Sequence, residues 1–385
     1  MIEKLADMIT DVQIKSPMKV ISAFMLITLL LLPGIFNLIG NVEASLEKVL
    51  PSDVDEVKIM NNMRSQFGAD MMYIVLYSES PLYDVRNPKM LLYIDLIAQK
   101  LRTRDYIISV DTLADLVKSN EKLPLSLSES KELLSVNPLY MQYTNNDYSL
   151  TVIRIKSDTG ASASSIKSVV VSIKNDMESL ENYNPGSTYH ITGFNAIDKA
   201  TFEVIISDFV SITLISMALV AAVVIFTFRS LKKAMMPMLV VLISLIWTLG
   251  IVGYIGLTIT VVSMVAAAMI LGLGIDFGIH VVHTYYHLRN KHGREKSLKG
   301  MLSELLRAML GASFTTVSGF LALLFGVLPA MKTLGIILAI GILSTLAASV
   351  FLLPTLVYVY DSEPDRKVET NVHKNKKTLK GGIKK

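Results

Sequence analysis

Six apolar stretches, each about 20 residues long, constrain the fold of this chain more than any other feature. They lie at residues 20–40, 209–228, 235–254, 259–282, 309–330 and 334–358. A helix that crosses the hydrocarbon core of a bilayer needs roughly 20 predominantly apolar residues. Hydrophobic residues make up 51% of the 385-residue chain, which is high for a soluble domain. The sequence therefore predicts an α-helical polytopic membrane protein with six transmembrane helices.

The first stretch, 20–40, is predicted to remain in the protein as a transmembrane helix. It is longer than the apolar region of a secretory signal, and no small-residue cleavage site follows it. The other five stretches fall within 209–360, so the long segment 41–208 separates one helix from five. We expect this one-plus-five arrangement.

The charges of the short loops predict how the helices are oriented. The loop 229–233 carries three Lys or Arg residues, and the loop 283–306 carries five. The loops 255–257 and 330–332 together carry one. Because basic loops remain in the cytoplasm, we expect both termini there and segment 41–208 on the other side of the plasma membrane.

Segment 41–208 has the pattern of a mixed α/β domain. The predicted strands are 71–77, 106–110, 149–155 and 188–192, and the predicted helices are 55–67, 87–104, 126–136 and 162–182. A further helical pattern runs from 195 to 208 into the second apolar stretch. Strands that alternate with helices in this way indicate a split βαβ, ferredoxin-like unit.

The two ends of the chain are predicted to contact the membrane surface. Residues 1–19 carry apolar side chains at helical spacing, at Ile2, Leu5, Ile9 and Val12. This spacing predicts an amphipathic helix on the cytoplasmic surface, and a frayed terminus is the alternative. The tail 361–385, expected to be disordered, holds eight Lys or Arg against four Asp or Glu. Beside a membrane, such a basic tail favours anionic lipid headgroups over nucleic acid.

The sequence lacks the motifs of the common enzyme and nucleotide sites. It has no cysteine, no G-x-S-x-G elbow and no G-x-x-x-x-G-K-[ST] loop. His190, the one histidine of segment 41–208, lies in a predicted strand and is expected to be structural. We therefore expect no catalysis, no cofactor and no bound nucleotide, so any work must draw on an ion gradient or a partner.

Asp276 is the only acidic residue in a stretch long enough to cross a bilayer. A carboxylate at the membrane centre costs roughly 2.5–3.5 kcal/mol, so such residues usually belong to a proton or ion relay, a substrate pathway or a buried ion pair. Asp276 is the residue on which we expect function to depend.

Three histidines share a helix face with Asp276. At 100° per residue, a stripe roughly 60° wide contains Asp276, His280, His283 and His287. Histidine titrates near neutral pH, so Asp276 and His280 form the predicted proton-coupling pair. His283 and His287 either extend this relay or are ordinary residues at a helix end. The spacing of the histidines also allows a metal ion, but no second shell of carboxylates accompanies them, so no metal site is predicted.

Small and hydroxylated residues surround this acid in the sequence. Gly272, Gly274 and Gly278 would let neighbouring helices approach closely, which is how helices pack in lipid. In the fifth stretch, hydroxyl groups are supplied by Thr315, Thr316 and Ser318. These hydroxyls either hydrogen-bond to Asp276 or bond back to carbonyls of their own helix.

Three segments carry a resemblance to a known superfamily. They are 272–280 (GLGIDFGIH), 313–325 (SFTTVSGFLALLF) and 334–356 (LGIILAIGILSTLAASVFLLPTL). With the expected topology, they resemble the resistance-nodulation-division (RND) superfamily of exporters, in particular the hydrophobe and amphiphile exporters that include MmpL-type and hopanoid-type lipid transporters. The resemblance covers residues 20–360, and it implies that segment 41–208 is a porter domain.

The resemblance implies that protonation of Asp276 couples a proton gradient to the export of lipids or amphiphiles. The superfamily often has Tyr directly after this acid, and Asp and Tyr then form hydrogen-bonded pairs between the two repeats. The present chain has Phe277 at this position, so it lacks the hydroxyl for such a hydrogen bond. Members usually hold two six-helix halves, which implies that this half-sized chain forms a homodimer, or a trimer as in other branches. Two alternatives share the fold, namely a lipid- or sterol-sensing component and an accessory to protein export.

Overall fold

The computed structural model describes residues 2–40, 42, 50–51, 53–67, 70–78, 84–119, 122–159 and 163–361. The described residues divide into two compact units. The helical unit is built from described residues of Met1–Asn41, Asp208–Gly326 and Met331–Lys385. The sheet unit is built from Val42–Ser207 and Val327–Ala330. Most of the basic tail predicted at 361–385 lies outside the described residues.

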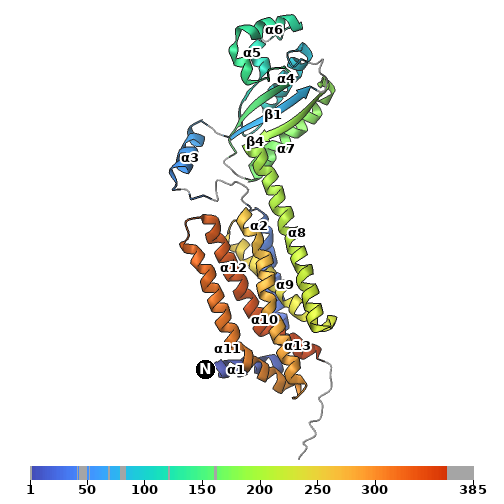
Figure 1. Cartoon of the computed structure of the whole chain (residues 1–385), viewed down its shortest axis with the longest axis vertical. Coiled ribbons are helices and arrows are strands. Elements are labelled where there is room, and N and C mark those ends of the chain that lie inside the picture. Colours follow the sequence, from blue (N-terminus) through green and yellow to red (C-terminus); the bar gives the residue numbers. More distant parts are fainter. Residues whose placement is uncertain are drawn as a thin grey trace, which may run out of the picture. The chain divides into compact units, whose positions relative to one another are not determined.

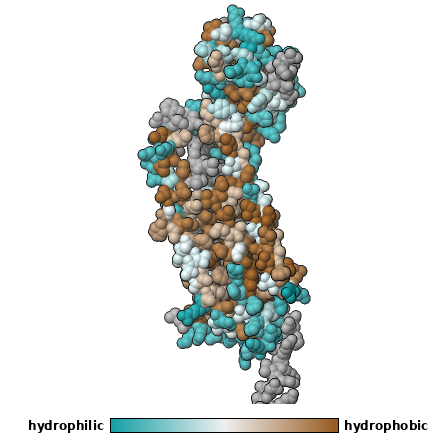
Figure 2. All heavy atoms as spheres, viewed as in Figure 1, coloured by the Kyte–Doolittle hydropathy of each residue, from teal (hydrophilic) through white to brown (hydrophobic). Residues whose placement is uncertain are grey.

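Six helices among the described residues are long and apolar enough to cross a membrane, as the hydropathy of the sequence predicts. They are Pro17–Leu38, Phe194–Phe228, Leu231–Ile255, Val261–Arg289, Arg294–Phe325 and Pro329–Tyr360. Figure 2 shows hydrophobic side chains along the middle of these helices and hydrophilic ones at the end of the helical unit where the N-terminal helix lies. This distribution is that of a polytopic membrane protein.

The helices of the helical unit are labelled in Figure 1. The α-helices are α1 (Ile2–Lys15), α2 (Pro17–Gly40), α8 (Phe194–Phe228), α9 (Leu231–Ile255), α10 (Ala266–Arg289), α11 (Arg294–Leu321), α12 (Pro329–Ala347) and α13 (Leu353–Tyr360). Short 3₁₀ turns are η4 (Val261–Val265) and η5 (Ala322–Phe325), and a π-helical turn, η6 (Ala348–Leu352), joins α12 to α13. The α8 helix also includes the last residues of the sheet unit.

Helices α2 and α9 touch through their backbones. A Cβ atom built on Gly253 would lie 1.8 Å from the carbonyl oxygen of Gly34, and one on Gly34 would lie 2.2 Å from that of Gly250. Nearby, the Trp247 indole donates a 2.8 Å hydrogen bond to the Thr28 hydroxyl. In lipid, the hydrophobic effect does not drive helices together, and close packing through small residues does so instead. These glycines therefore stabilise the contact between α2 and α9.

The N-terminal helix α1 has two apolar stripes, one buried and one exposed. Ala6, Ile9 and Thr10 are buried, and the helix packs on α11. Lys299 of α11 forms a 2.7 Å ion pair with Asp11. A second stripe of apolar side chains is exposed, formed by Leu5, Met8 and Val12. The helix therefore has one apolar face toward the bundle and another that is free to enter a membrane surface.

Gln13 of α1 explains how the chain accommodates a proline in its last membrane-spanning helix. Pro354 has no N–H, so the carbonyl of Val350 receives no ordinary helical hydrogen bond from position 354. The Gln13 amide donates to the carbonyls of Val350 (2.9 Å) and Phe351 (3.0 Å) instead. A side chain from the other end of the chain thereby supplies hydrogen bonds to two carbonyl groups of the π-helical turn.

The sheet unit has the β-α-β-β-α-β order of a split βαβ fold. Its strands are β1 (Asp70–Ser78), β2 (Ile107–Asp111), β3 (Leu150–Ser157) and β4 (Ser187–Gly193). Its α-helices are α3 (Asp55–Phe67), α4 (Pro88–Leu101), α5 (Leu113–Val117), α6 (Leu127–Val136) and α7 (Ala163–Ser179), with 3₁₀ turns η2 (Pro138–Gln142) and η3 (Glu181–Tyr183). The strands lie in the order β2-β3-β1-β4, and every neighbouring pair is antiparallel.

One face of this sheet carries the core. Met72, Ile74 and Leu76 alternate along β1 and are fully buried, and Ile74 is paired with Ile153 of β3 and Ile191 of β4. Buried residues of α4 and α7 belong to the same hydrophobic cluster. A period of two in the strands and of 3.6 in the helices directs all these side chains to one layer.

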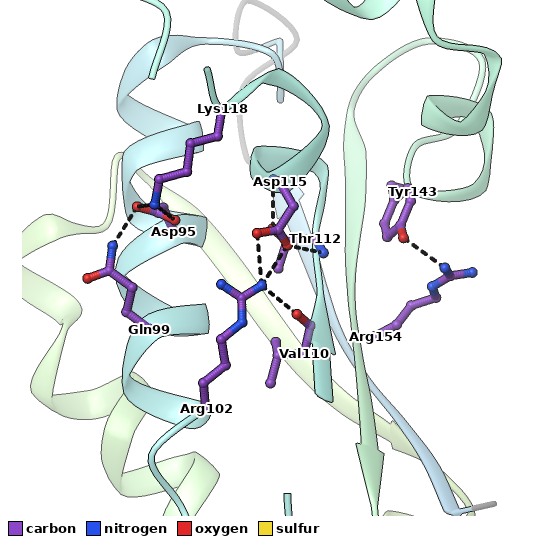
Figure 3. A network of polar contacts seen from close by, with 9 residues as sticks. All are labelled: Asp95, Gln99, Arg102, Val110, Thr112, Asp115, Lys118, Tyr143 and Arg154. Carbon is purple, nitrogen blue, oxygen red and sulfur yellow. Dashed lines mark hydrogen bonds and ion pairs between the residues drawn. The ribbon is translucent and has the colours of Figure 1, made fainter. Parts of the chain in front are cut away.

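Charged side chains tie α4 to the elements that follow it (Figure 3). Lys118 contacts both carboxylate oxygens of the buried Asp95 at 2.9 and 3.0 Å, and Gln99 donates to the same carboxylate. Arg102 donates to the Asp115 carboxylate, whose oxygen also accepts from the backbone N–H of Thr112. Each carboxylate therefore has partners within the unit, and the cluster has a structural role.

Acid is expected to destabilise this unit in part through Asp84. Burial alone would raise the pKa of Asp84, but hydrogen bonds from Arg86 and the charges of Arg86 and Lys131 outweigh it and hold the pKa below its ordinary value. A carboxyl with a lowered pKa contributes stability above its unfolded value near 4, and the contribution is lost as the pH falls through the folded value. Between about pH 5 and pH 3, the Asp84→Asn variant should therefore lose less thermal stability than the wild type. Calorimetry checks this, and parallel losses would contradict it.

Candidate functional site

Helix α10 carries Asp276 and is built with two different faces. Its buried face holds Ile270, Gly274, Gly278, Val281 and Tyr285. A Cβ atom built on Gly274 would lie 2.8 Å from the Thr345 side chain of α12, and one on Gly278 would lie 2.6 Å from Pro237 of α9. These two glycines therefore bring α10 close to both neighbours, while a Cβ on Gly272 would meet nothing within 4 Å.

The opposite face of α10 carries the polar stripe. Asp276, His280, His283 and His287 are all exposed in the single chain. The rings of His283 and His287 are stacked, with centroids 6.4 Å apart and planes 8° apart. Within the described part of the chain, no hydrogen bond or ion pair reaches the Asp276 carboxylate. These four side chains lie on one face of α10, and the described residues of the single chain leave that face exposed.

The hydroxyl groups of α11 bond to their own helix. Thr315 donates to the carbonyls of Gly311 (3.1 Å) and Ala312 (2.9 Å). Thr316 donates to the carbonyl of Ala312 at 2.8 Å, and Ser318 donates to that of Phe314 at 2.8 Å. In this state of the chain they hold no hydrogen bond to Asp276. Of the two alternatives that the sequence left open, the local bond is the one observed.

Phe277 points away from the polar stripe. It is partly buried against a small hydrophobic cluster of Val317, Ala339 and Ile342 from α11 and α12. The residue after Asp276 is therefore part of the packing within this chain.

A buried ionic cluster lies at the end of α10, and the sequence analysis missed it. Arg289 Nε donates to Asp361 Oδ2 at 2.6 Å, and the Tyr285 hydroxyl donates to the same oxygen at 2.8 Å. Arg294 Nε lies 4.0 Å from that oxygen. Only 3% of the Arg289 side chain and 1% of the Asp361 side chain are exposed. The cluster fixes the end of α13 to the α10–α11 junction.

One sequence signal for this pair did exist. Arg289 and Asp361 are opposite charges that lie within seven residues of the ends of two apolar stretches. The ends of two spans on the same side of a bundle lie at one level. No group of three or more His, Cys, Asp or Glu side chains among the described residues is arranged to hold a metal ion.

A comparison with protein-family models matches residues 51–379 to the MMPL family. The chain belongs to the MMPL family. Because the match covers most of the sheet unit and of the helical unit, it applies to the chain as a whole. It confirms the resemblance to the RND superfamily that the motif around Asp276 indicated.

Two relatives extend the comparison. The archaeal protein named "Putative membrane protein MJ1562" from Methanocaldococcus jannaschii is 28% identical over 351 residues, which span 87% of this chain and 90% of the relative. The protein named "Putative membrane protein ActII-3" from Streptomyces coelicolor is 26% identical over 181 residues, 46% of this chain and 26% of that longer protein. MMPL membership indicates a membrane transporter of the RND type, and members of this family are transporters rather than enzymes.

Proposed function

We propose that this protein exports lipids or other amphiphiles by proton coupling through Asp276, and that it works as a homodimer. The observation that supports this proposal is the exposed Asp276 carboxylate in the middle of a membrane-spanning helix, which has no hydrogen bond or ion pair to any residue that the structure describes. A charge facing lipid at that depth costs about 2.5–3.5 kcal/mol, so a second protein surface must cover it. The same face of a second copy is the simplest cover, because a two-fold axis places identical surfaces against each other.

The homodimer also gives the stripe a chemical role. Two Asp276 carboxylates close to the axis would repel each other when both are charged, so the proposed dimer favours a proton held between them. His280, His283 and His287 continue from Asp276 toward the end of α10, over about 16 Å of helix. Histidines can pass protons near neutral pH, which makes this stripe a route between Asp276 and the adjacent aqueous side.

The rest of the chain fits an exporter of amphiphiles in the proposed topology. The basic loops around Arg229 and Arg294 are proposed to be cytoplasmic, with both termini. The sheet unit, between the first and second spans, is then the extracytoplasmic porter domain. Protonation at Asp276 would shift the packing of α10, and the unbroken helix α8 would carry that shift toward the sheet unit.

Disulfide cross-linking tests the homodimer directly, because the chain has no cysteine of its own. Met269 falls within the Asp276 stripe at 100° per residue and is exposed. Oxidation of the Met269→Cys variant in membranes should give a covalent dimer, since the two copies meet at this face. The matched control is Leu29→Cys, an exposed position on α2, which should stay monomeric. Equal cross-linking of both variants, or none at Met269→Cys, would contradict the proposed interface.

A further inference from the structure

A pocket at the start of α9 has a mixed lining that no part of the proposed transport mechanism uses. It has a volume of about 750 Å³, within the range of pockets that bind small molecules. One end is formed by Ser230, Lys232 and Lys233, where α9 begins. The remainder is formed mainly by apolar side chains of α9 and α13, among them Met235, Leu239, Leu356 and Val359.

The polar end of the pocket is arranged to attract an anion. Lys233 is half-buried, with its ammonium nitrogen 3.9 Å from the centre of the Tyr286 ring, so its position is restricted. Ser230 is the N-cap residue of α9, but its hydroxyl makes no capping hydrogen bond. Two lysines, a hydroxyl and the first turn of a helix thus border the same pocket.

The one carboxylate that borders the pocket does not oppose such a ligand. Asp361 lines the pocket, but its Oδ2 atom accepts hydrogen bonds from Arg289 and Tyr285. Its charge is therefore already compensated by a guanidinium.

The apolar part of the pocket runs into the membrane-spanning segment. Leu239 follows Lys232 by seven residues, which is about 10 Å along a helix. The Met235 and Leu239 side chains are exposed within an apolar span, so they would face alkyl chains. A ligand that fits has one anionic end at the level where α9 begins and an alkyl chain along α9 and α13.

We propose that this pocket binds an anionic phospholipid from the surrounding membrane. Lys232, Lys233 and the start of α9 hold its phosphate, and an acyl chain lies against Met235 and Leu239. Basic pockets between membrane-spanning helices are known to suit such headgroups. The site is separate from the proton-coupling stripe, because Tyr286 lies roughly 80° around α10 from Asp276.

The test is lipid binding to the purified full chain in detergent, measured by native mass spectrometry. We expect phosphatidylglycerol to bind the wild type at least about ten-fold more tightly than the Lys232→Gln/Lys233→Gln variant, a difference of about 1.4 kcal/mol. The matched control is Lys291→Gln/Lys296→Gln, which removes the same charge from exposed positions of the next basic loop. It should bind as the wild type does. An equal loss in the control would mean general attraction to positive charge and would overturn the proposal.

Four further measurements identify the ligand and the site. Phosphatidylcholine and free glycerol phosphate should each bind at least about ten-fold more weakly than phosphatidylglycerol; equal binding of either would overturn the assignment to an anionic lipid. Leu239→Trp, which fills the apolar part, should weaken phosphatidylglycerol binding without changing any charge, and an unchanged affinity would also count against the proposal. Asp276→Asn should leave phosphatidylglycerol binding intact. The lipid site and the proton-coupling role of Asp276 can therefore fail independently of each other.

Discussion

Replacing Asp276 by Asn should abolish gradient-driven transport while the protein still folds. Asparagine has nearly the same shape as aspartic acid but carries no titratable proton, so it cannot couple proton movement to a change in packing. Moving one charge through the membrane potential is worth about 2.3 kcal/mol per 100 mV, and the variant loses this driving force. The measurement is export of a fluorescent lipid analogue from reconstituted vesicles under an imposed pH gradient. We expect the rate to fall to that of vesicles without protein.

A carboxylate on another helix provides the control for this experiment. Glu304 lies on α11 and is exposed, and the Glu304→Gln variant removes a carboxylate of similar chemistry outside the stripe. It should transport at close to the wild-type rate. Gradient-dependent transport that persists in Asp276→Asn would refute the coupling role. If the wild type bound lipid but transported none under a gradient, the alternative of a lipid-sensing protein would be favoured.

Replacing Arg289 by Leu should lower the free energy of unfolding of the helical unit by about 3–5 kcal/mol. The substitution leaves the Asp361 carboxylate buried, with Arg294 at 4.0 Å as the remaining nearby guanidinium. A buried carboxylate that loses its closest guanidinium costs far more than the loss of a surface contact. The measurement is denaturant unfolding in mixed micelles, followed by the fluorescence of Trp247, the one tryptophan of the chain.

Two further variants make the Arg289 result specific. Lys299→Gln breaks the exposed ion pair with Asp11, whose side chains are 43% and 46% accessible, and should cost less than about 1 kcal/mol. The double variant Arg289→Leu/Asp361→Leu removes both charges and should recover most of the lost stability, since a buried pair can often be replaced by apolar residues at little cost. If Arg289→Leu cost no more than Lys299→Gln, the buried cluster would not have the structural role assigned to it.

Features of the fold that depend on local patterns could be predicted from the sequence. Runs of apolar residues predicted the six long helices, because a helix that crosses a bilayer needs about 20 predominantly apolar residues in a row. Alternation gave strands such as β3, where every second side chain is buried. The alternation of strands and helices predicted a split βαβ unit, and the observed order β2-β3-β1-β4 agrees with such a unit. The short helix α5 was missed because its five residues are too few for a helical period to show.

For the candidate site, too, only the features that depend on local sequence patterns could be predicted. Helical spacing alone placed Asp276 and the three histidines on one face. What lies opposite that face is a property of tertiary and quaternary structure, which no local pattern encodes. The pairing of Arg289 with Asp361 joins residues 72 positions apart, and the bond from Gln13 to Val350 joins residues 337 apart. Contacts of that kind depend on how the helices pack.

The π-helical turn η6 fixes the direction in which the end of the last span points. Loss of one residue from Ala348–Leu352 could restore an ordinary helix, but everything beyond it would then rotate by about 100° and shift by about 1.5 Å. Asp361 would swing away from Arg289 and Tyr285, and the carbonyls bound by Gln13 would turn elsewhere. The chain can therefore tolerate changes of side chain in this turn more easily than a change in its length. A shortened variant would lose both the Asp361 cluster and the Gln13 hydrogen bonds.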